Sequence, residues 1–479
     1  MVHDKFCQRE GQESDDIMRV VLINPPLVAD RSLINEGGIP YMPILLASIN
    51  GVLRNLKFDV RVFDMFGLAP QLARINGDNI VYGMNWDGIR AVIKEDDVII
   101  IFVTQAICLG VIKDIIKGAK EAKAKRIILA ENSQHVLGIA LDLYKDELFS
   151  YGVDYILCGD PEADLVAAVN GFSKDRCSRK YTNIDLLPAP DWTGFPLQNY
   201  WKLSYAHAPK IEKKYISLLT SRGCPNACRF CTSPYLNKSK WRGRSVQKVF
   251  EEIRGWCHRA VREFHIEDLN PTVDKKRFKE LCQLIIDSGL LVKIKIASGT
   301  KMETLDEDLL LWMHDAGVDY LSFSPESGSK ALLQFMGKKF DHAYALKMLD
   351  FINSFRFTNP MITQACFVLG YPHETELDID LTRKYIKELA IHGLDEIALF
   401  SYVPLPGAAE TRAQIDPTKA SFSSKWKGNY SYMNSLKMQM TLEFYLYQFM
   451  YRPFRIFRFF RTKVWMTIKR LLIMRWLNG

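Results

Sequence analysis

The sequence lacks any uncharged apolar run of the roughly 18–20 residues that a membrane-spanning helix needs, so no spanning helix is predicted. It also lacks the apolar core of a secretory signal between Met1 and Arg19, and its 10 cysteines are scattered along a long chain. We therefore expect a reducing, cytoplasmic environment and no disulfide framework. Low-complexity segments and short tandem repeats are missing as well, which disfavours repeat architectures.

Net positive charge is small outside the C-terminal tail. The formal net charge is +8, but residues 441–479 hold eight Lys and Arg against the single acid Glu443, a local balance of +7. The rest of the chain therefore carries only +1. A basic body that binds nucleic acid is not indicated, so we expect no nucleic-acid partner.

The N-terminal half alternates apolar strands with helices. The predicted strands are 19–26, 59–64, 97–103, 126–130 and 154–158, and the predicted helices include 42–56 and 111–124. Strands of near-continuous apolar character imply a parallel sheet covered on both faces. The pattern predicts an α/β domain with a doubly wound parallel sheet, whose ligands bind at the carboxyl ends of the strands.

A second alternating series follows a proline-rich stretch. Its predicted strands are 215–220, 263–267, 292–297, 320–324, 361–369 and 396–402, separated by helices such as 246–259, 275–288 and 306–316. Six strand–helix units predict a partial (β/α)6 barrel of the TIM type.

These patterns divide a chain of 479 residues into several parts, as its length leads us to expect. We predict a flexible leader at 1–16, the sheet domain at 17–170, a linker at 171–210, the barrel at 211–420 and a helical, basic and aromatic region at 421–479.

Three cysteines stand close together in the loop predicted after the first barrel strand, as Cys224-Pro-Asn-Ala-Cys228-Arg-Phe-Cys231. Three such thiolates can hold three irons of one cubane and leave the fourth iron open to a chelating ligand. A zinc site would want a fourth protein ligand, and His207 and Cys257 are poorly placed to supply it. The motif therefore favours a [4Fe–4S] cluster over structural zinc.

The spacing Cys-x3-Cys-x2-Cys, with an aromatic residue before the last cysteine, resembles the signature of the radical S-adenosylmethionine (radical SAM) superfamily. The resemblance implies that Cys224, Cys228 and Cys231 ligate the cluster. It also implies that S-adenosylmethionine chelates the open iron beside Phe230 and yields a deoxyadenosyl radical on reduction. An electron donor such as a flavodoxin or ferredoxin is implied as a partner.

Residues at later strand ends match the same family. Glu267 and Asp268 follow the second barrel strand, and the resemblance implies that they lie near the amino group of S-adenosylmethionine. Glu326, in a Glu-Ser-Gly element after the fourth strand, is implied near the ribose, and Ser298 near the methionyl end. Each also has a plainer interpretation, because acids at strand ends are often solvated or cap the next helix.

The N-terminal half resembles the cobalamin-binding-like domain of one branch of this superfamily. The residues that carry the resemblance are Leu22-Ile-Asn-Pro-Pro26, Pro43-Ile-Leu-Leu-Ala47, Asp64 and Val153-Asp-Tyr-Ile-Leu-Cys-Gly-Asp-Pro-Glu162. The branch includes cobalamin-dependent radical methylases and the anaerobic magnesium-protoporphyrin cyclase. Cobalamin is therefore implied as a third cofactor.

The turn after the fourth strand departs from that branch. Glu131 stands where a corrin ring needs small residues, and Ser133 replaces the Asp of the Asp-x-His-x-x-Gly motif that supplies a cobalt-ligating histidine. We interpret His135 as an ordinary polar loop residue. Any cobalamin is thus expected to bind without a protein nitrogen on cobalt.

The resemblance implies a radical SAM enzyme that modifies an unactivated carbon of a small-molecule or lipid-like substrate. Cobalamin-dependent methyl transfer is one outcome; cobalamin-independent cyclisation, oxidation or carbon–carbon coupling is the alternative. A methylthiotransferase would need a second set of cluster cysteines, which Cys7, Cys108 and Cys158 do not resemble. A zinc- or cluster-stabilised protein that binds membrane or nucleic acid is the alternative of another class.

The tail leaves two interpretations open. Arg452, Arg455, Arg458 and Arg461 recur every three residues, so on a helix they spiral instead of forming one stripe. The segment is either a helix packed on the barrel or a peripheral contact with the anionic inner face of a membrane.

Overall fold

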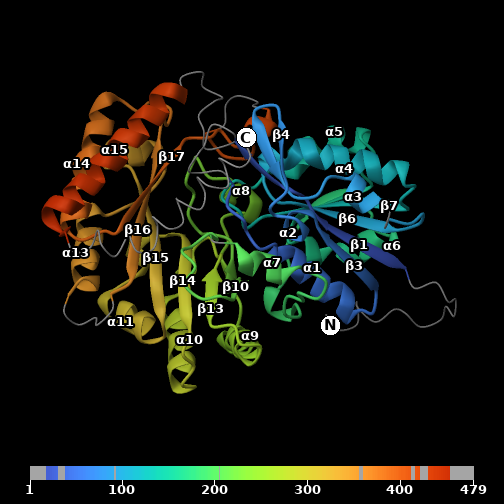
Figure 1. The fold of residues 1–479 in the computed structure, drawn as a ribbon, viewed down its shortest axis with the longest axis horizontal. Coiled ribbons are helices and arrows are strands. Elements are labelled where there is room, and N and C mark those ends of the chain that lie inside the picture. The colour runs from blue at the N-terminus through green and yellow to red at the C-terminus, as the bar shows by residue number, and fades with distance from the viewer. Residues whose placement is uncertain are drawn as a thin grey trace.

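The computed structural model describes residues 18–30, 38–90, 93–203, 205–354, 360–410, 416–420 and 430–453. Two sheet domains lie side by side, with the N-terminal domain on the right of Figure 1 and the barrel on the left. The predicted leader at 1–16 and most of the basic tail, 454–479, lie outside the described residues.

Six parallel strands form the N-terminal sheet in the order β3-β1-β6-β7-β8-β9. They are β1 (Arg19–Asn24), β3 (Asp59–Asp64), β6 (Val98–Val103), β7 (Arg126–Glu131), β8 (Tyr155–Gly159) and β9 (Cys177–Lys180). Alternate residues of β6 pack into two different cores, one that contains α1 (Ile44–Asn55) and one that contains α4 (Leu109–Glu121). The sheet is thus covered on both faces, which confirms the predicted doubly wound domain.

Two features of this domain had no signal in the sequence. β9 lies inside the segment predicted as a linker and pairs with β8 as the last strand of the sheet. Its residues, Cys-Ser-Arg-Lys, are polar and half-buried, so they show no apolar run. A small antiparallel sheet also forms from β2 (Leu27–Asp30), β4 (Ala73–Asn76) and β5 (Asn79–Tyr82). The domain bounds themselves stay predictions.

The barrel sheet has six parallel strands in sequential order, as predicted. They are β10 (Tyr215–Leu218), β13 (Glu263–Ile266), β14 (Lys293–Thr300), β15 (Val318–Glu326), β16 (Ile362–Leu369) and β17 (Glu396–Ser401). Its helices are α8 (Ser233–Asn237), α9 (Val246–His258), α10 (Lys275–Asp287), α11 (Glu307–Asp315), α12 (Lys330–Phe335), α13 (His342–Ile352) and α14 (Glu376–Ile391). The sheet is not closed, because β10 and β17 are both edge strands.

Most barrel helices begin at a side chain that caps the free backbone N–H groups of the first turn. These caps are Asp274, Asp306, Ser329, Asp341 and Thr375, and the last forms a reciprocal capping box with Asp378. The caps fix the first residue of each helix. They therefore fix the length of the loop that joins the carboxyl end of each strand to the next helix.

The C-terminal region is helical as far as it is described. α15 (Tyr430–Tyr451) packs beside α14 and β17, and the side chain of Gln448 donates to the carbonyls of Leu394 and Asp395 at 2.6 and 3.0 Å. Within the described residues, no helix is both long and apolar enough to cross a bilayer.

Candidate active site

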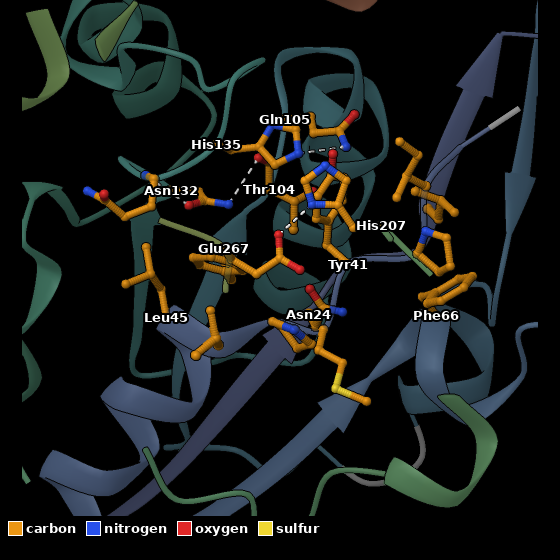
Figure 2. Close-up of a pocket in the computed structure, with 18 of the residues that line it drawn as sticks. Asn24, Tyr41, Leu45, Phe66, Thr104, Gln105, Asn132, His135, His207 and Glu267 are labelled. Atoms are coloured by element: carbon orange, nitrogen blue, oxygen red, sulfur yellow. Dashed lines mark hydrogen bonds and ion pairs between the residues drawn. The ribbon is translucent and has the colours of Figure 1, made fainter. Parts of the chain in front are cut away.

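A pocket lies between the two domains, where the carboxyl ends of both sheets meet (Figure 2). Asn24, Thr104 and Asn132 line it from the ends of β1, β6 and β7, and Leu219, Glu267 and Ser298 line it from the barrel. The empty space within its walls is about 790 Å³, which includes open solvent.

The backbone immediately before the cysteine loop, at Gly223, is fixed by close contacts. Gly223 has a φ of +81°, and a Cβ there would come within 2.0 Å of the carbonyl oxygen of Lys240. Its N–H donates to the side-chain oxygen of Gln134 in the N-terminal domain at 2.8 Å. Glycine is therefore required immediately before Cys224, and the other domain helps to fix the loop.

The three cysteine thiols are free and face a common region. Asn226 donates to Sγ of Cys224 at 3.2 Å, and the backbone N–H of Ser233 donates to Sγ of Cys231 at 3.4 Å. Among the described residues, these three sulfurs do not all lie within 4.8 Å of one another. Ligands of one zinc ion, at Zn–S distances of about 2.3 Å, would lie closer than that.

Burial, and after it the neighbouring Cys228, raise the pKa of the Cys231 thiol to about 12. Burial also raises the pKa of Cys228, while the ammonium of Lys338 opposes that rise. Buried neutral thiols of this kind become thiolates when a metal binds them, because the metal replaces the proton. The donor set therefore fits a metal cluster.

Glu326 and Lys338 form a buried ion pair next to this loop, with Oε1 and Nζ 2.7 Å apart. Burial alone would lower the pKa of Lys338, but Glu326 and then Cys228 raise it overall. Glu326 ends β15 with a φ of +67°, which is costly for a residue other than glycine. The structure thus brings the predicted Glu326 to the site together with Lys338, which the sequence did not indicate.

Phe230 and Ser298 also lie close to the site. Phe230 packs on a small core of Leu332, Leu333, Met336, Tyr371 and Tyr402. Its neighbour Arg229 pairs with the buried Glu410 at 3.0 Å. Ser298 lines the pocket and is 8% exposed. The cysteine loop is thereby anchored to the far strands of the barrel as well as to the N-terminal domain.

Asp268 and Glu267 are adjacent but face different ways. Asp268 is fully buried and accepts hydrogen bonds from the backbone and hydroxyl of Thr220 and from the hydroxyl of Ser221, at 2.5–2.7 Å. Glu267 points into the pocket instead and accepts from Nδ1 of His207 at 2.6 Å. Asp268 therefore holds the strand that leads to Cys224, and Glu267 belongs to the pocket wall.

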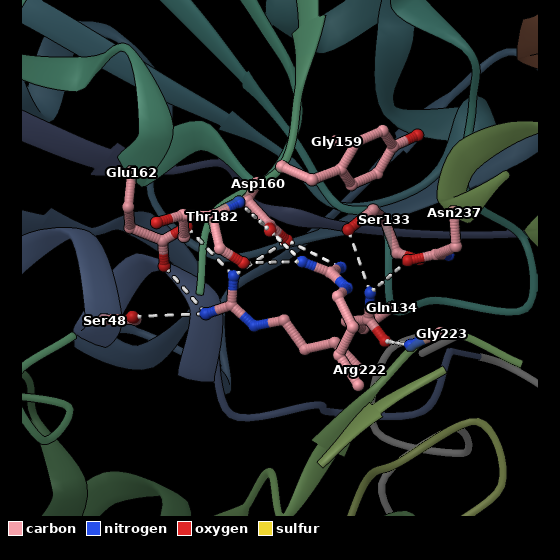
Figure 3. A network of polar contacts seen from close by, with 12 residues as sticks. Ser48, Ser133, Gln134, Gly159, Asp160, Glu162, Thr182, Arg222, Gly223 and Asn237 are labelled. Atoms are coloured by element: carbon pink, nitrogen blue, oxygen red, sulfur yellow. Dashed lines mark hydrogen bonds and ion pairs between the residues drawn. The ribbon is translucent and has the colours of Figure 1, made fainter. Parts of the chain in front are cut away.

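A cluster of buried charges joins the two domains beneath the cysteine loop (Figure 3). Arg222 contacts Glu162 at 2.8 and 3.0 Å and Asp160 at 3.2 Å, and Arg242 pairs with the other oxygen of Asp160. Burial alone would raise the pKa of Asp160, but the two arginines lower it. We call Asp160, Glu162, Arg222 and Arg242 the interdomain clamp. It places the residue before Gly223 against the ends of β8 and its following turn.

His207, Tyr41 and His135 form the aromatic part of the pocket wall. The Tyr41 ring lies 4.6 Å from each of the two imidazoles, between centroids. Burial lowers the pKa of His135 to about 3, and His207 adds to that effect, so His135 is neutral. Our interpretation of His135 as an ordinary loop residue misses this position in the pocket.

Glu131 does not obstruct the pocket, contrary to our expectation. Its carboxylate turns away and is held by Arg179 at 2.6 and 3.0 Å and by the backbone N–H groups of Leu141 and Gly159. Burial raises the pKa of Glu131, although Arg179 opposes the rise. Because Arg179 comes from the unpredicted strand β9, the sequence alone gave no reason to turn Glu131 inward.

Comparison with known families identifies the barrel. Residues 218–402 match the model of the Radical SAM superfamily. An uncharacterized methyltransferase of Pyrococcus horikoshii is 25% identical over 416 residues, which cover 82% of this chain and 82% of that protein. The anaerobic magnesium-protoporphyrin IX monomethyl ester cyclase of Synechocystis is 28% identical over 206 residues, 39% of this chain and 40% of the cyclase.

A solved structure shares the arrangement of both domains. The radical S-adenosylmethionine methyltransferase TsrM from Kitasatospora setae, with cobalamin and a [4Fe–4S] cluster bound, superimposes with a TM-score of 0.57. The match covers 82% of this chain and 74% of TsrM at 14% identity. At that identity the likeness concerns the fold.

Proposed function

Because residues 218–402 match the Radical SAM superfamily, we propose that the chain is a cobalamin-dependent radical SAM methyltransferase. Cys224, Cys228 and Cys231 are the proposed cluster ligands. Their support is that the three thiols are free, partly buried and close enough to interact electrostatically. When bound, the reduced cluster supplies the electron that cleaves S-adenosylmethionine, and a methylated cobalamin supplies the methyl group.

The observation that carries the methyltransferase proposal is the pocket shared by the two domains. In parallel α/β sheets, ligands bind beyond the carboxyl ends of the strands, and here the ends of β1, β6 and β7 open directly onto the barrel mouth. Apolar residues such as Pro25, Pro40 and Pro43 and amides such as Gln105 and Asn132 line it. A flat macrocycle with amide side chains suits such a wall, and Glu131 leaves the space free.

His135 supports the expectation that no protein nitrogen reaches cobalt. The backbone N–H of Leu137 donates to Nδ1 of His135 at 3.0 Å, so the proton of the neutral ring is on Nε2. Nε2 lies 3.4 Å from the side-chain amide of Gln105. Both ring nitrogens of His135 are thus engaged by the protein itself, one by Leu137 and the other by Gln105.

His207 is the group that we propose to meet the substrate. Its Nδ1 donates to Glu267, which fixes the tautomer and leaves the Nε2 lone pair for an N–H or O–H of the substrate. Among the described residues, no hydrogen bond to Nε2 of His207 is formed. Glu326 with Lys338, and Ser298, are the proposed contacts to S-adenosylmethionine, since they border the cysteine loop and the pocket.

Anaerobic reconstitution with iron, sulfide and hydroxocobalamin tests the proposal. We expect one [4Fe–4S] cluster by electron paramagnetic resonance and stoichiometric cobalt, with cleavage of S-adenosylmethionine. Single Cys224→Ala, Cys228→Ala and Cys231→Ala variants should lose the cluster, whereas Cys282→Ala, in the buried face of α10, should keep it. A full cluster signal in any of the first three would overturn the ligand assignment.

The alternative is cobalamin-independent cyclisation, oxidation or carbon–carbon coupling, which the cyclase relative keeps open. Sub-stoichiometric cobalt together with an intact cluster would favour it. In either case we propose a small-molecule or lipid-like substrate, a flavodoxin or ferredoxin as electron donor, and a cytoplasmic protein that contacts the inner face of the membrane through its C-terminal region.

A further inference from the structure

The C-terminal helix α15 has apolar side chains on both of its faces. Its inner face is buried on the barrel through Met433, Leu436, Met440 and Phe444. Its outer face exposes five further apolar side chains, which we call the outer stripe. They are Met438, Leu442, Leu446, Phe449 and Met450, each 56–64% exposed.

The outer stripe runs along one side of the helix. At 3.6 residues per turn, positions 438, 442, 446, 449 and 450 fall within an arc of roughly 120°. A helix on the surface of a globular protein normally carries charged side chains on that side. The two charged residues within α15 lie elsewhere: Lys437 is buried, and Glu443 is directed to Arg383 of α14, with 3.8 Å between the charged groups.

The sequence that follows the stripe indicates what covers it. Residues 454–479 contain seven Lys and Arg, no Asp or Glu, and 15 apolar residues, two of them Trp. A second copy of this chain would bring two such basic segments together, which like charges oppose. An anionic lipid surface instead favours both the basic and the apolar residues, because it attracts Lys and Arg and takes up apolar side chains just below the headgroups.

We propose that the outer stripe of α15 seats in the headgroup region of an anionic bilayer, with the basic segment after it providing the electrostatic attraction. This deepens the peripheral location proposed above by naming the contact surface. α15 lies at the end of the barrel away from the N-terminal domain (Figure 1). No described residue of α15 lines the pocket between the domains, so lipid contact leaves the proposed chemistry unobstructed.

Flotation of the full-length, cluster-loaded protein with vesicles tests this contact. We expect binding to phosphatidylcholine vesicles that contain phosphatidylglycerol, little binding to pure phosphatidylcholine, and weaker binding as salt rises. The triple variant Leu442→Ser/Leu446→Ser/Phe449→Ser should bind at least about 100-fold more weakly, since three large apolar side chains no longer enter the bilayer.

The matched control changes exposed apolar residues far from α15. Phe172 and Leu291 are 80% and 87% exposed, and Phe172→Ser/Leu291→Ser should float like the wild-type protein. Both variants should keep the cluster spectrum and the cleavage of S-adenosylmethionine, so lipid binding and the proposed function can fail independently.

Two results would overturn the proposal. One is wild-type protein that does not float with anionic vesicles, and the other is a triple variant that still floats fully. Sedimentation that shows a concentration-dependent dimer, lost in the triple variant without any vesicle binding, would instead assign the stripe to a second copy of the chain.

Discussion

The interdomain clamp and the pocket wall are both polar sites between the same two domains, yet their hydrogen-bonding differs. In the clamp, Arg222 is enclosed by two carboxylates and a hydroxyl, and both oxygens of Asp160 accept hydrogen bonds. In the pocket wall, His207 bonds Glu267 through one ring nitrogen, and within the described residues the other ring nitrogen forms no hydrogen bond. A fully paired buried group positions the chain, whereas a half-paired group facing a cavity is available for binding.

The largest effect on stability is expected from Arg222→Met. It leaves the buried Glu162 without its cation, and breaking a buried pair in this way costs about 3–5 kcal/mol of unfolding free energy. Anaerobic urea unfolding followed by fluorescence measures the loss. The double variant Arg222→Met/Glu162→Gln should recover much of it, and a near-neutral single variant would show that the clamp is not a positioning site.

Asp268→Asn comes next, because Asn cannot accept the three hydrogen bonds that Asp268 accepts from Thr220 and Ser221. Hydrogen bonds to a charged group contribute about 1.5–3 kcal/mol, so we expect a loss of that size. The cluster content should fall with it, measured as iron per protein after reconstitution. Full cluster occupancy at unchanged stability would show that Asp268 does not support the cysteine loop.

The third effect concerns pH and His135. Its native pKa of about 3 lies below the unfolded value of 6.5, so between these values the unfolded chain binds a proton that the native protein does not. Its contribution to stability is therefore present above pH 6.5 and is lost as pH falls, by up to about 1.4 kcal/mol per pH unit. Unfolding midpoints of wild type and His135→Gln across this range should diverge, and parallel curves would contradict the buried, neutral histidine.

The smallest stability effect is expected from Glu267→Gln, the neighbour of Asp268. The amide keeps the size of the side chain and can still accept from His207, so the loss should stay within about 1 kcal/mol. The visible spectrum of bound hydroxocobalamin and the turnover of a substrate, once known, should change, because the carboxylate no longer orients His207. If Glu267→Gln lost as much stability as Asp268→Asn, both acids would have a structural role, and the proposed difference between them would be wrong.

The sequence predicted what depends on local patterns. All six barrel strands overlap their predicted ranges because each contains several apolar residues between helix-like segments, and the cysteine loop was found from its spacing. The contacts that shape the site join residues far apart in the chain. His207 and Glu267 are 60 positions apart, and Arg222 and Ser48 are 174 apart. No local period marks such pairs.

The sequence also did not predict the direction of side chains at strand ends. Glu267 and Asp268 are both carboxylates in adjacent positions. Only their hydrogen-bond partners show that Glu267 lines the pocket and that Asp268 supports the cysteine loop. Glu131 illustrates the same point, since its direction follows from Arg179 on a polar edge strand that lacks an apolar signature. Lys338 was missed because its partner Glu326 lies across a helix and a turn.

The open barrel also bears on how the protein avoids association with itself. An edge strand offers free backbone groups to any other strand, and this sheet has two such edges. At β10, the indole of Trp201 donates to the carbonyl of Tyr215 at 2.7 Å, and at the other end α15 packs alongside β17. The segment before the barrel and the helix after it thus cover the two edge strands. Removing the segment around Trp201, or α15, would expose an edge strand that can pair with another chain and promote aggregation.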